Sequence, residues 1–242
     1  MNKAILSTSL VSSLLLLPSL SLAEEATWSG NAELGFIQTK GNSDTQSFNG
    51  KFDITRELQP LTSAFTLEAL TSEENGEPSK EKYLSELKFD YSFAKHSYAT
   101  SLLSYEDDRF NGYQYQSLLF VGYGYRAWND VNGKLDLEAG PGYRRNSLEQ
   151  RNEHGEKVEQ EAIARVSMKL SVKISDNAKF TEALSVEGSD SKVVYKSNMG
   201  LQSTLIGQLA MKINYQVKHT TAVPETAKKT DSLVGITLVY SF

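Results

Sequence analysis

The chain has no cysteine, which excludes disulfide bonds, thiolate metal sites and cysteine nucleophiles. After residue 23 it also has no run of 18 consecutive apolar residues, so no transmembrane helix is predicted. Basic residues do not dominate either: the net charge is −5, which argues against nucleic acid as a partner. Aromatic residues, in contrast, are abundant, with 12 Tyr, 10 Phe and 2 Trp. Tyr and Trp favour the interface between a membrane and water.

The first 23 residues have the features of a secretory signal peptide. Lys3 gives a positive start, residues 4–17 are mostly apolar, and Ser21-Leu22-Ala23 is a small-x-small cleavage site. The apolar run is shorter than the roughly 20 residues that a membrane anchor needs. We therefore expect a cleaved signal peptide over residues 1–23 and an exported domain over residues 24–242.

Apolar and polar residues alternate along the exported domain in twelve segments separated by turn residues. A β-strand sends successive side chains to opposite faces, so each segment predicts a strand with one apolar and one polar face. The clearest segment covers residues 83–93, where apolar residues alternate with Glu86, Lys88 and Asp90. In the segment 113–126 the pattern places Tyr113 on the apolar face. The segments 97–107 and 179–188 are strands whose faces the pattern does not assign.

The predicted strands favour a membrane barrel over a soluble β-sandwich. They are longer than the five or six residues usual for strands, and their number is even, which returns both ends of the chain to one side of a membrane. A closed barrel leaves no unpaired strand edge in hydrocarbon. The predicted fold is all-β: a transmembrane antiparallel up-and-down β-barrel of 12 strands, with the apolar face toward lipid and the polar face toward a lumen.

The charged residues of the polar faces are the candidate functional residues. The first seven segments contribute mostly acids and the later ones bases, so opposite walls of the lumen are expected to carry opposite charge. Either water fills the lumen and this field orients small polar solutes, or the charges pair across a narrow bore and plug it. The predicted lumen-facing charges are Glu33, Lys51, Asp53, Glu68, Glu86, Lys88, Asp90, Asp136, Glu138, Arg144, Arg165, Lys169, Lys173, Lys196, Lys212 and Lys218.

Three further motifs have simpler interpretations. His219 falls on the apolar face near the outer rim, where a catalytic base of a lipid hydrolase would lie, but contact with lipid headgroups is the simpler interpretation. Glu106-Asp107-Asp108 has carboxylates that could bind Ca²⁺, but the spacing matches no dedicated calcium loop. Gly140-Pro141-Gly142 lies inside a strand and predicts a bulge, a bend or a close approach of the backbone. No metal site and no cofactor are predicted.

The last strand, residues 233–242, resembles the terminal strand of bacterial outer-membrane barrels. This resemblance implies that Tyr240 and Phe242 form the signal for the barrel-assembly machinery. It also implies an outer-membrane location, in contact with outer-membrane lipid and lipopolysaccharide.

Several motifs along the whole exported domain resemble those of the salt-induced outer-membrane protein family (YdiY-like), whose shared domain has no assigned function. They are Thr39-Lys40-Gly41-Asn42-Ser43, Asp108-Arg109-Phe110-Asn111-Gly112-Tyr113, Gly140-Pro141-Gly142-Tyr143-Arg144, Ile174-Ser175-Asp176-Asn177-Ala178 and Leu238-Val239-Tyr240-Ser241-Phe242. The resemblance implies a Gram-negative outer-membrane barrel, related to salt or osmotic stress, and carries over no catalytic or ligand residue.

Three functions follow as hypotheses. The first is a non-enzymatic barrel that is structural or conducts small solutes weakly, as a porin does. The second is a lipid-modifying enzyme that uses His219. The third is a surface barrel that binds a partner through the loops at residues 146–157 and 221–229.

Overall fold

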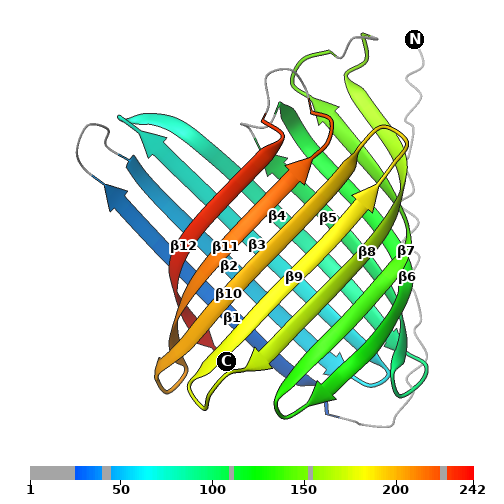
Figure 1. Ribbon diagram of the computed structural model, residues 1–242, viewed down its shortest axis with the longest axis vertical. Coiled ribbons are helices and arrows are strands. Elements are labelled where there is room, and N and C mark those ends of the chain that lie inside the picture. The colour runs from blue at the N-terminus through cyan, green and yellow to red at the C-terminus, as the bar shows by residue number, and fades with distance from the viewer. Residues whose placement is uncertain (1–24, 40–44, 109–111, 152–154, 224–227) are drawn as a thin grey trace, which may run out of the picture.

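The computed structural model is a single closed β-barrel of twelve antiparallel strands (Figure 1). It describes residues 25–39, 45–108, 112–151, 155–223 and 228–242, so the predicted signal peptide lies outside the described residues. The strands are β1 (Thr27–Thr39), β2 (Thr45–Leu58), β3 (Leu61–Glu74), β4 (Glu77–Ser92), β5 (Ser97–Asp108), β6 (Tyr113–Asp130), β7 (Gly133–Leu148), β8 (Val158–Lys173), β9 (Ala178–Gly188), β10 (Val193–Ile206), β11 (Leu209–Thr220) and β12 (Thr230–Ser241).

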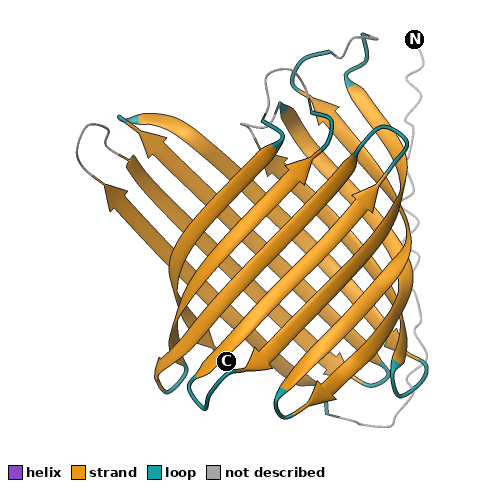
Figure 2. Ribbon diagram, viewed as in Figure 1, coloured by secondary structure: helices purple, strands orange, loops and turns teal. Residues whose placement is uncertain are grey.

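The two ends of the barrel differ in their connections. At one end, here the turn end, β2–β3, β4–β5, β6–β7, β8–β9 and β10–β11 are joined by short turns, and the C terminus lies there (Figure 2). At the other end, here the loop end, the connections β5–β6, β7–β8 and β11–β12 are the stretches that the sequence predicts as longer loops. A spanning strand needs about 9–11 residues. Because β6 has 18 residues, the wall extends beyond the hydrocarbon.

Each strand pairs with its neighbours in sequence, and β1 closes the ring by pairing with β12. Gly30 and Phe242 exchange two backbone hydrogen bonds, of 2.9 and 3.0 Å. The pairing then runs only from Asn31 opposite Ser241 to Leu34 opposite Leu238. Toward the loop end β1 and β12 diverge (Figure 1). This β1–β12 seam is much shorter than the β1–β2 pairing, which extends from Thr27 to Thr39.

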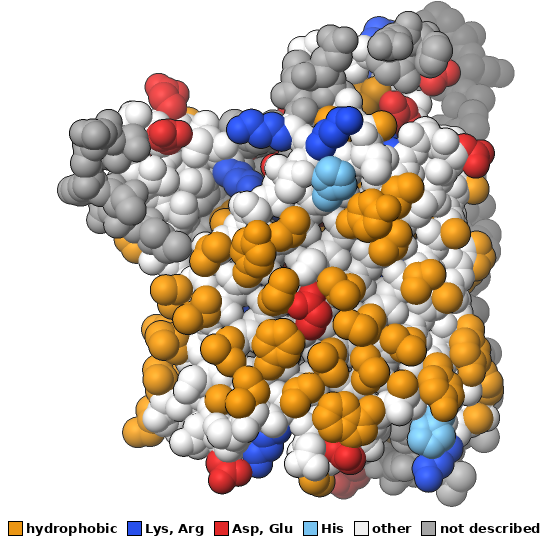
Figure 3. Space-filling view, viewed as in Figure 1, with side chains coloured by type: hydrophobic (Ala, Val, Ile, Leu, Met, Phe, Trp, Pro, Cys, Tyr) orange, Lys and Arg blue, Asp and Glu red, His pale blue; other side chains and the backbone are white. Residues whose placement is uncertain are grey.

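The apolar and polar residues that alternate in the sequence lie on the outer and the inner surface of the barrel wall, as predicted. Large apolar side chains such as Leu34, Leu87 and Ile236 are exposed on the outside, where they form a belt (Figure 3). Polar side chains between them point inward; Glu33 and Thr237 are buried there. Within the described residues, no helix is long and apolar enough to cross a membrane.

The interior also holds an apolar cluster that the sequence pattern does not predict. Leu102, Leu118, Phe120 and Ile163 pack together inside the barrel. Phe120 is fully buried, and the guanidinium of Arg165 lies 4.9 Å from the centre of its ring. Burying such a side chain contributes roughly 1.5–3 kcal/mol, so this cluster stabilises the packing of β5, β6 and β8 on the inner side of the wall.

The structure corrects the face of one predicted residue and assigns another segment. Tyr113 is buried inside the barrel, not exposed to lipid, because the β6–β7 register shifts between Tyr113 and Tyr115. β5 alternates regularly: Tyr98, Leu102 and Glu106 point inward. The apolar residues of this inward face explain why the sequence pattern alone left β5 without assigned faces.

The glycines of Gly140-Pro141-Gly142 allow β6 and β7 to approach closely. A Cβ on Gly140 would lie 2.2 Å from the carbonyl oxygen of Val121 and 2.5 Å from the Cα of Gly122. The register on both sides of the motif is the same, with Phe120 opposite Gly142 and Tyr123 opposite Ala139. Of the predicted alternatives, the close approach is therefore the one observed, without a bulge.

Candidate functional site

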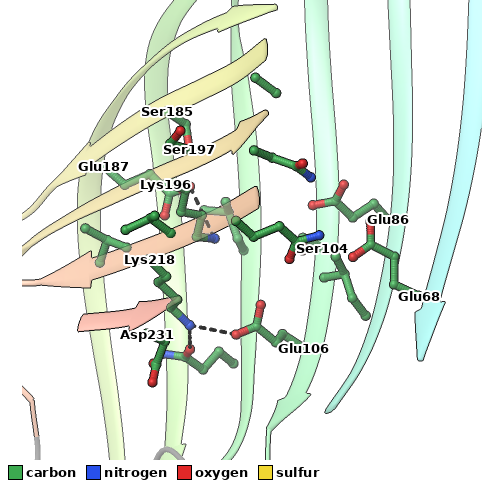
Figure 4. Close-up of a pocket in the computed structure, with 18 of the residues that line it drawn as sticks. Glu68, Glu86, Ser104, Glu106, Ser185, Glu187, Lys196, Ser197, Lys218 and Asp231 are labelled. Atoms are coloured by element: carbon green, nitrogen blue, oxygen red, sulfur yellow. Dashed lines mark hydrogen bonds and ion pairs between the residues drawn. The ribbon is translucent and has the colours of Figure 1, made fainter. Parts of the chain in front are cut away.

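Two cavities occupy the interior. A cavity of about 440 Å³ lies in the loop-end half and is lined by residues of β2 to β12 (Figure 4). A second cavity, of about 420 Å³, lies at the turn end among the β6–β7 and β8–β9 turns. The two share no lining residue. On β8 the successive inward side chains Lys169 and Ser171 line the loop-end and the turn-end cavity respectively.

One ion pair crosses the bore from wall to wall. The ammonium of Lys218 on β11 donates a hydrogen bond of 2.7 Å to Glu106 on β5, as Figure 4 shows. In the ring of twelve strands β5 and β11 lie opposite each other. Lys218 also donates to Gln116, and Lys82 forms a second ion pair with Glu106, at 3.2 Å. These contacts narrow the bore at the level of Glu106.

A second network surrounds Glu138 on β7. Its carboxylate accepts hydrogen bonds from Lys88 on β4 and, at 3.0 Å, from the hydroxyl of the buried Tyr98 on β5. Arg165 on β8 lies 3.7 Å from the same carboxylate. Removing such partners from a buried carboxylate strongly destabilises a protein. This network therefore holds β4, β5, β7 and β8 in position.

Glu187 on β9 is the centre of a third network. It pairs with Arg144, with Arg165 at 3.4 Å and with Lys196 at 3.8 Å. Because Arg165 contacts both Glu138 and Glu187, the second and third networks are continuous. The sequence pattern did not include Glu187, although its alternation with the lipid-facing Val186 and Leu184 is the signal that identifies it.

The structure brings most of the predicted lumen charges to the loop-end cavity. Those that line it are Lys51, Glu68, Glu86, Lys88, Asp136, Glu138, Arg144, Arg165, Lys169, Lys196 and Lys218. Lys51 pairs with Glu68 at 2.6 Å. The remaining predicted charges lie outside this cavity and are Glu33, Asp53, Asp90, Lys173 and Lys212.

These remaining charges also have partners. Lys212 pairs with Glu33 at 2.8 Å, Asp53 accepts a hydrogen bond from Asn31, and Asp90 pairs with Lys88. Lys173 lies at the turn end, where it pairs with Asp176 at 2.9 Å. Its hydrogen bond and positive charge lower the pKa of Asp176, which lies in the exposed β8–β9 turn.

Lys169 differs from the other lysines that the sequence predicts in the lumen. Its ammonium forms no ion pair and no hydrogen bond with any residue that the structure describes, although Asp136 is its register partner on β7. Lys51 and Lys88 repel it electrostatically, and Asp53 and Asp136 attract it without contacting its ammonium directly. Lys169 therefore contributes a positive charge without a direct counterion to the lining of the loop-end cavity.

The charge of the loop-end cavity is opposite in sign to that of the whole chain. Eleven Lys or Arg and eight Asp or Glu line it, an excess of three positive charges, whereas the chain has a net charge of −5. The expected separation of acids and bases between opposite walls is incomplete. Glu161 and Glu187 lie among the bases on β8 and β9, and Lys82 lies among the acids on β4.

The other candidate motifs do not form a reaction centre in the described residues. The Nδ1 of His219 is hydrogen-bonded to Thr230 at 2.7 Å, and its ring packs on Tyr195; no serine hydroxyl in the described part of the chain bonds it. Glu106 is buried and points into the lumen, whereas Asp107 lies on the opposite face of β5. In the described ranges no group of His, Cys, Asp or Glu has a metal-binding arrangement.

Comparison with known proteins gives the family and the fold. The family model described as "Protein of unknown function, DUF481" matches residues 32–242. The chain belongs to this family. It is 27% identical over 215 residues to the "Uncharacterized protein YdiY" of Escherichia coli (strain K12), a match that covers 88% of this chain and 82% of the relative. The sequence prediction of a YdiY-like family is therefore confirmed.

Solved structures with a similar fold are outer-membrane barrels. The NanC porin has a TM-score of 0.51 at 8% identity, with 89% of this chain and 98% of NanC covered. The translocator domain of the autotransporter NalP from Neisseria meningitidis has a TM-score of 0.45 at 15% identity, with 90% and 88% covered. The ring of twelve paired strands and the NanC match confirm the prediction of a closed 12-strand barrel with a porin-like fold. At these identities the comparison bears on the fold alone.

Proposed function

We propose that the protein is a non-enzymatic outer-membrane channel that conducts small anionic solutes at a low rate. The observation that carries this proposal is Lys169, a lysine without an ion-pair partner in the described residues, which lines the loop-end cavity one inward position before Ser171 of the turn-end cavity. The excess of positive charge around the loop-end cavity acts in the same direction. A charged lining sets the sign of the ions that a pore admits.

The ion pair between Lys218 and Glu106 supports a low rate rather than a wide pore. It places two side chains from opposite walls across the bore. A solute that passes must go around this pair, which limits its size. In this proposal the loop end faces the outside of the cell and the turn end faces the periplasm, as short turns do in such barrels.

Planar-bilayer recording of the purified protein tests the proposal. Under a salt gradient the reversal potential should indicate a preference for chloride over potassium. Lys169→Gln should lower the chloride-to-potassium permeability ratio about sevenfold, because a unit charge ~7 Å from a passing ion in a water-filled bore contributes on the order of 0.6 kcal/mol, favourable for the anion and unfavourable for the cation. Lys95→Gln, in the exposed β4–β5 turn and in the lining of neither cavity, is the control and should leave the preference unchanged. Absence of any conductance from folded protein would exclude the channel.

The cellular setting belongs to the same proposal. We expect cleavage after residue 23, assembly by the barrel-assembly machinery through Tyr240 and Phe242, and contact with lipid and lipopolysaccharide. The packing of Phe242 on Phe52, with ring centres 6.2 Å apart, is consistent with a role of this residue in closing the barrel. We also expect that salt stress raises the amount of the protein, which an immunoblot of outer-membrane fractions from cells at two salt concentrations measures.

A further inference from the structure

The lipid-facing surface of β9 carries a carboxylate, Glu182, within the apolar belt. Glu182 lies on the same face of β9 as Leu184 and Val186, both 40% exposed, but Glu182 itself is only 8% exposed; it is the fifth of the eleven residues of this strand. Its register partners are the outward Leu170 on β8 and Met199 on β10. Figure 3 shows an acidic side chain surrounded by apolar side chains on this wall.

The carboxylate of Glu182 has little to bind within its own chain. The hydroxyl of Ser197 donates to it at 2.9 Å, and no lysine or arginine of the described residues forms an ion pair with it. A carboxylate can accept about four hydrogen bonds, and lipid chains donate none. Ionisable groups at this depth are costly and usually pair with other polar groups of a protein.

The same wall offers an unused donor at a matching position. Met199 pairs with Glu182 on one side and with Tyr215 of β11 on the other, which places Glu182 and Tyr215 roughly 10 Å apart. Tyr215 is 41% exposed on the outside, and its hydroxyl makes no hydrogen bond with any residue in the described ranges. An acceptor and a donor therefore flank Met199.

We infer that this wall binds a second copy of the chain, with a two-fold axis near Met199. All copies insert into the membrane with the same orientation, so the axis runs along the membrane normal. Rotation about it brings the Glu182 of each copy toward the Tyr215 hydroxyl of the other. Such a contact is isologous and closes as a dimer.

Cysteine cross-linking in outer membranes tests this dimer. The chain has no cysteine, so a single introduced one cannot form a disulfide within its own chain. Met199→Cys, near the axis, should form a disulfide-linked dimer upon oxidation. Leu67→Cys on β3, 44% exposed on another wall, is the matched control and should not. Equal cross-linking of the two variants, or a Met199→Cys adduct with a different protein, would overturn the inference.

The polar contact itself is tested in the Met199→Cys background. Glu182→Leu should lower the cross-linked fraction about threefold or more, and Tyr215→Phe should do the same. Tyr91→Phe, another exposed tyrosine on β4, should have no effect. The shift in gel mobility on heating verifies that each variant is folded. If Glu182→Leu does not fold, Tyr215→Phe still tests the contact, because it removes only one hydroxyl group. Unchanged cross-linking in both folded variants would mean that Glu182 and Tyr215 do not hold two copies together.

Discussion

At the scale of single residues, the interior of the barrel is organised by carboxylates that each have more than one cationic partner. Glu106 contacts Lys218 and Lys82, and Glu187 contacts Arg144, Arg165 and Lys196. A charge withdrawn from water is stabilised only by such partners. Among the lysines that the sequence predicts in the lumen, Lys169 has no carboxylate partner in the described residues, and this is why the proposed selectivity depends on it.

The pair across the bore can be tested through one of its members. Glu106→Gln leaves Lys218 in the lumen with no carboxylate opposite it, and we expect a loss of about 3 kcal/mol in the free energy of unfolding. Guanidinium unfolding in detergent, followed by the gel-mobility shift, measures it. The exposed pair of Lys173 and Asp176 is the control, and Lys173→Gln should give no measurable loss. If Glu106→Gln has the same free energy of unfolding as the unchanged protein, the pair does not stabilise the fold.

The sequence pattern predicts such residues only where their strand alternates clearly. Glu138 and Arg144 follow from the alternation of β7, and their positions in the networks are as expected for inward side chains. The position of Glu182 cannot be predicted in this way, because one acid on the apolar face of β9 leaves the two faces of that strand without a clear pattern. The partners of each charge cannot be read from the sequence at all, since they depend on which strands lie opposite each other in the closed ring.

At the scale of strands, the pair of β6 and β7 shows how the close packing of two backbones depends on glycine. Gly140 of β7 lies against Val121 and Gly122 of β6. Pro141 between the two glycines donates no hydrogen bond to the ladder. The motif therefore shapes the wall at the height of the apolar cluster of Leu102, Leu118, Phe120 and Ile163.

A methyl group on Gly140 should disturb this contact. Gly140→Ala places a Cβ against the backbone of Val121, and overpacking of this kind costs typically 1–3 kcal/mol. Gly188→Ala is a matched control, since no atom lies within 4 Å of a Cβ built there. The temperature of the gel-mobility shift should fall for Gly140→Ala only. Equal temperatures for the two variants would mean that β6 and β7 can move apart without a loss of stability.

At the scale of the whole molecule, the number of strands and their direction follow from the sequence, because alternation and turns are local signals. The seam between β1 and β12 does not, because it joins residues from opposite ends of the chain. Its short pairing, from Asn31 to Leu34, makes it the weakest junction in the ring.

A disulfide across the seam tests this weakness. Asn31 and Ser241 are register partners whose side chains are hydrogen-bonded at 2.7 Å. Asn31→Cys together with Ser241→Cys should raise the temperature of the gel-mobility shift under oxidising conditions, by an amount corresponding to about 2–4 kcal/mol. The same protein in a reductant is the control. If this temperature does not rise upon oxidation, the barrel opens first at another junction between strands.

The seam also has a consequence for the order of folding. Every other junction of the ring joins strands that follow each other in the chain, so each forms at a small cost in loop-closure entropy. Only the meeting of β1 with β12 requires contact between residues separated by about two hundred positions. A curved sheet should therefore assemble hairpin by hairpin, and the slow step should be the final cyclisation.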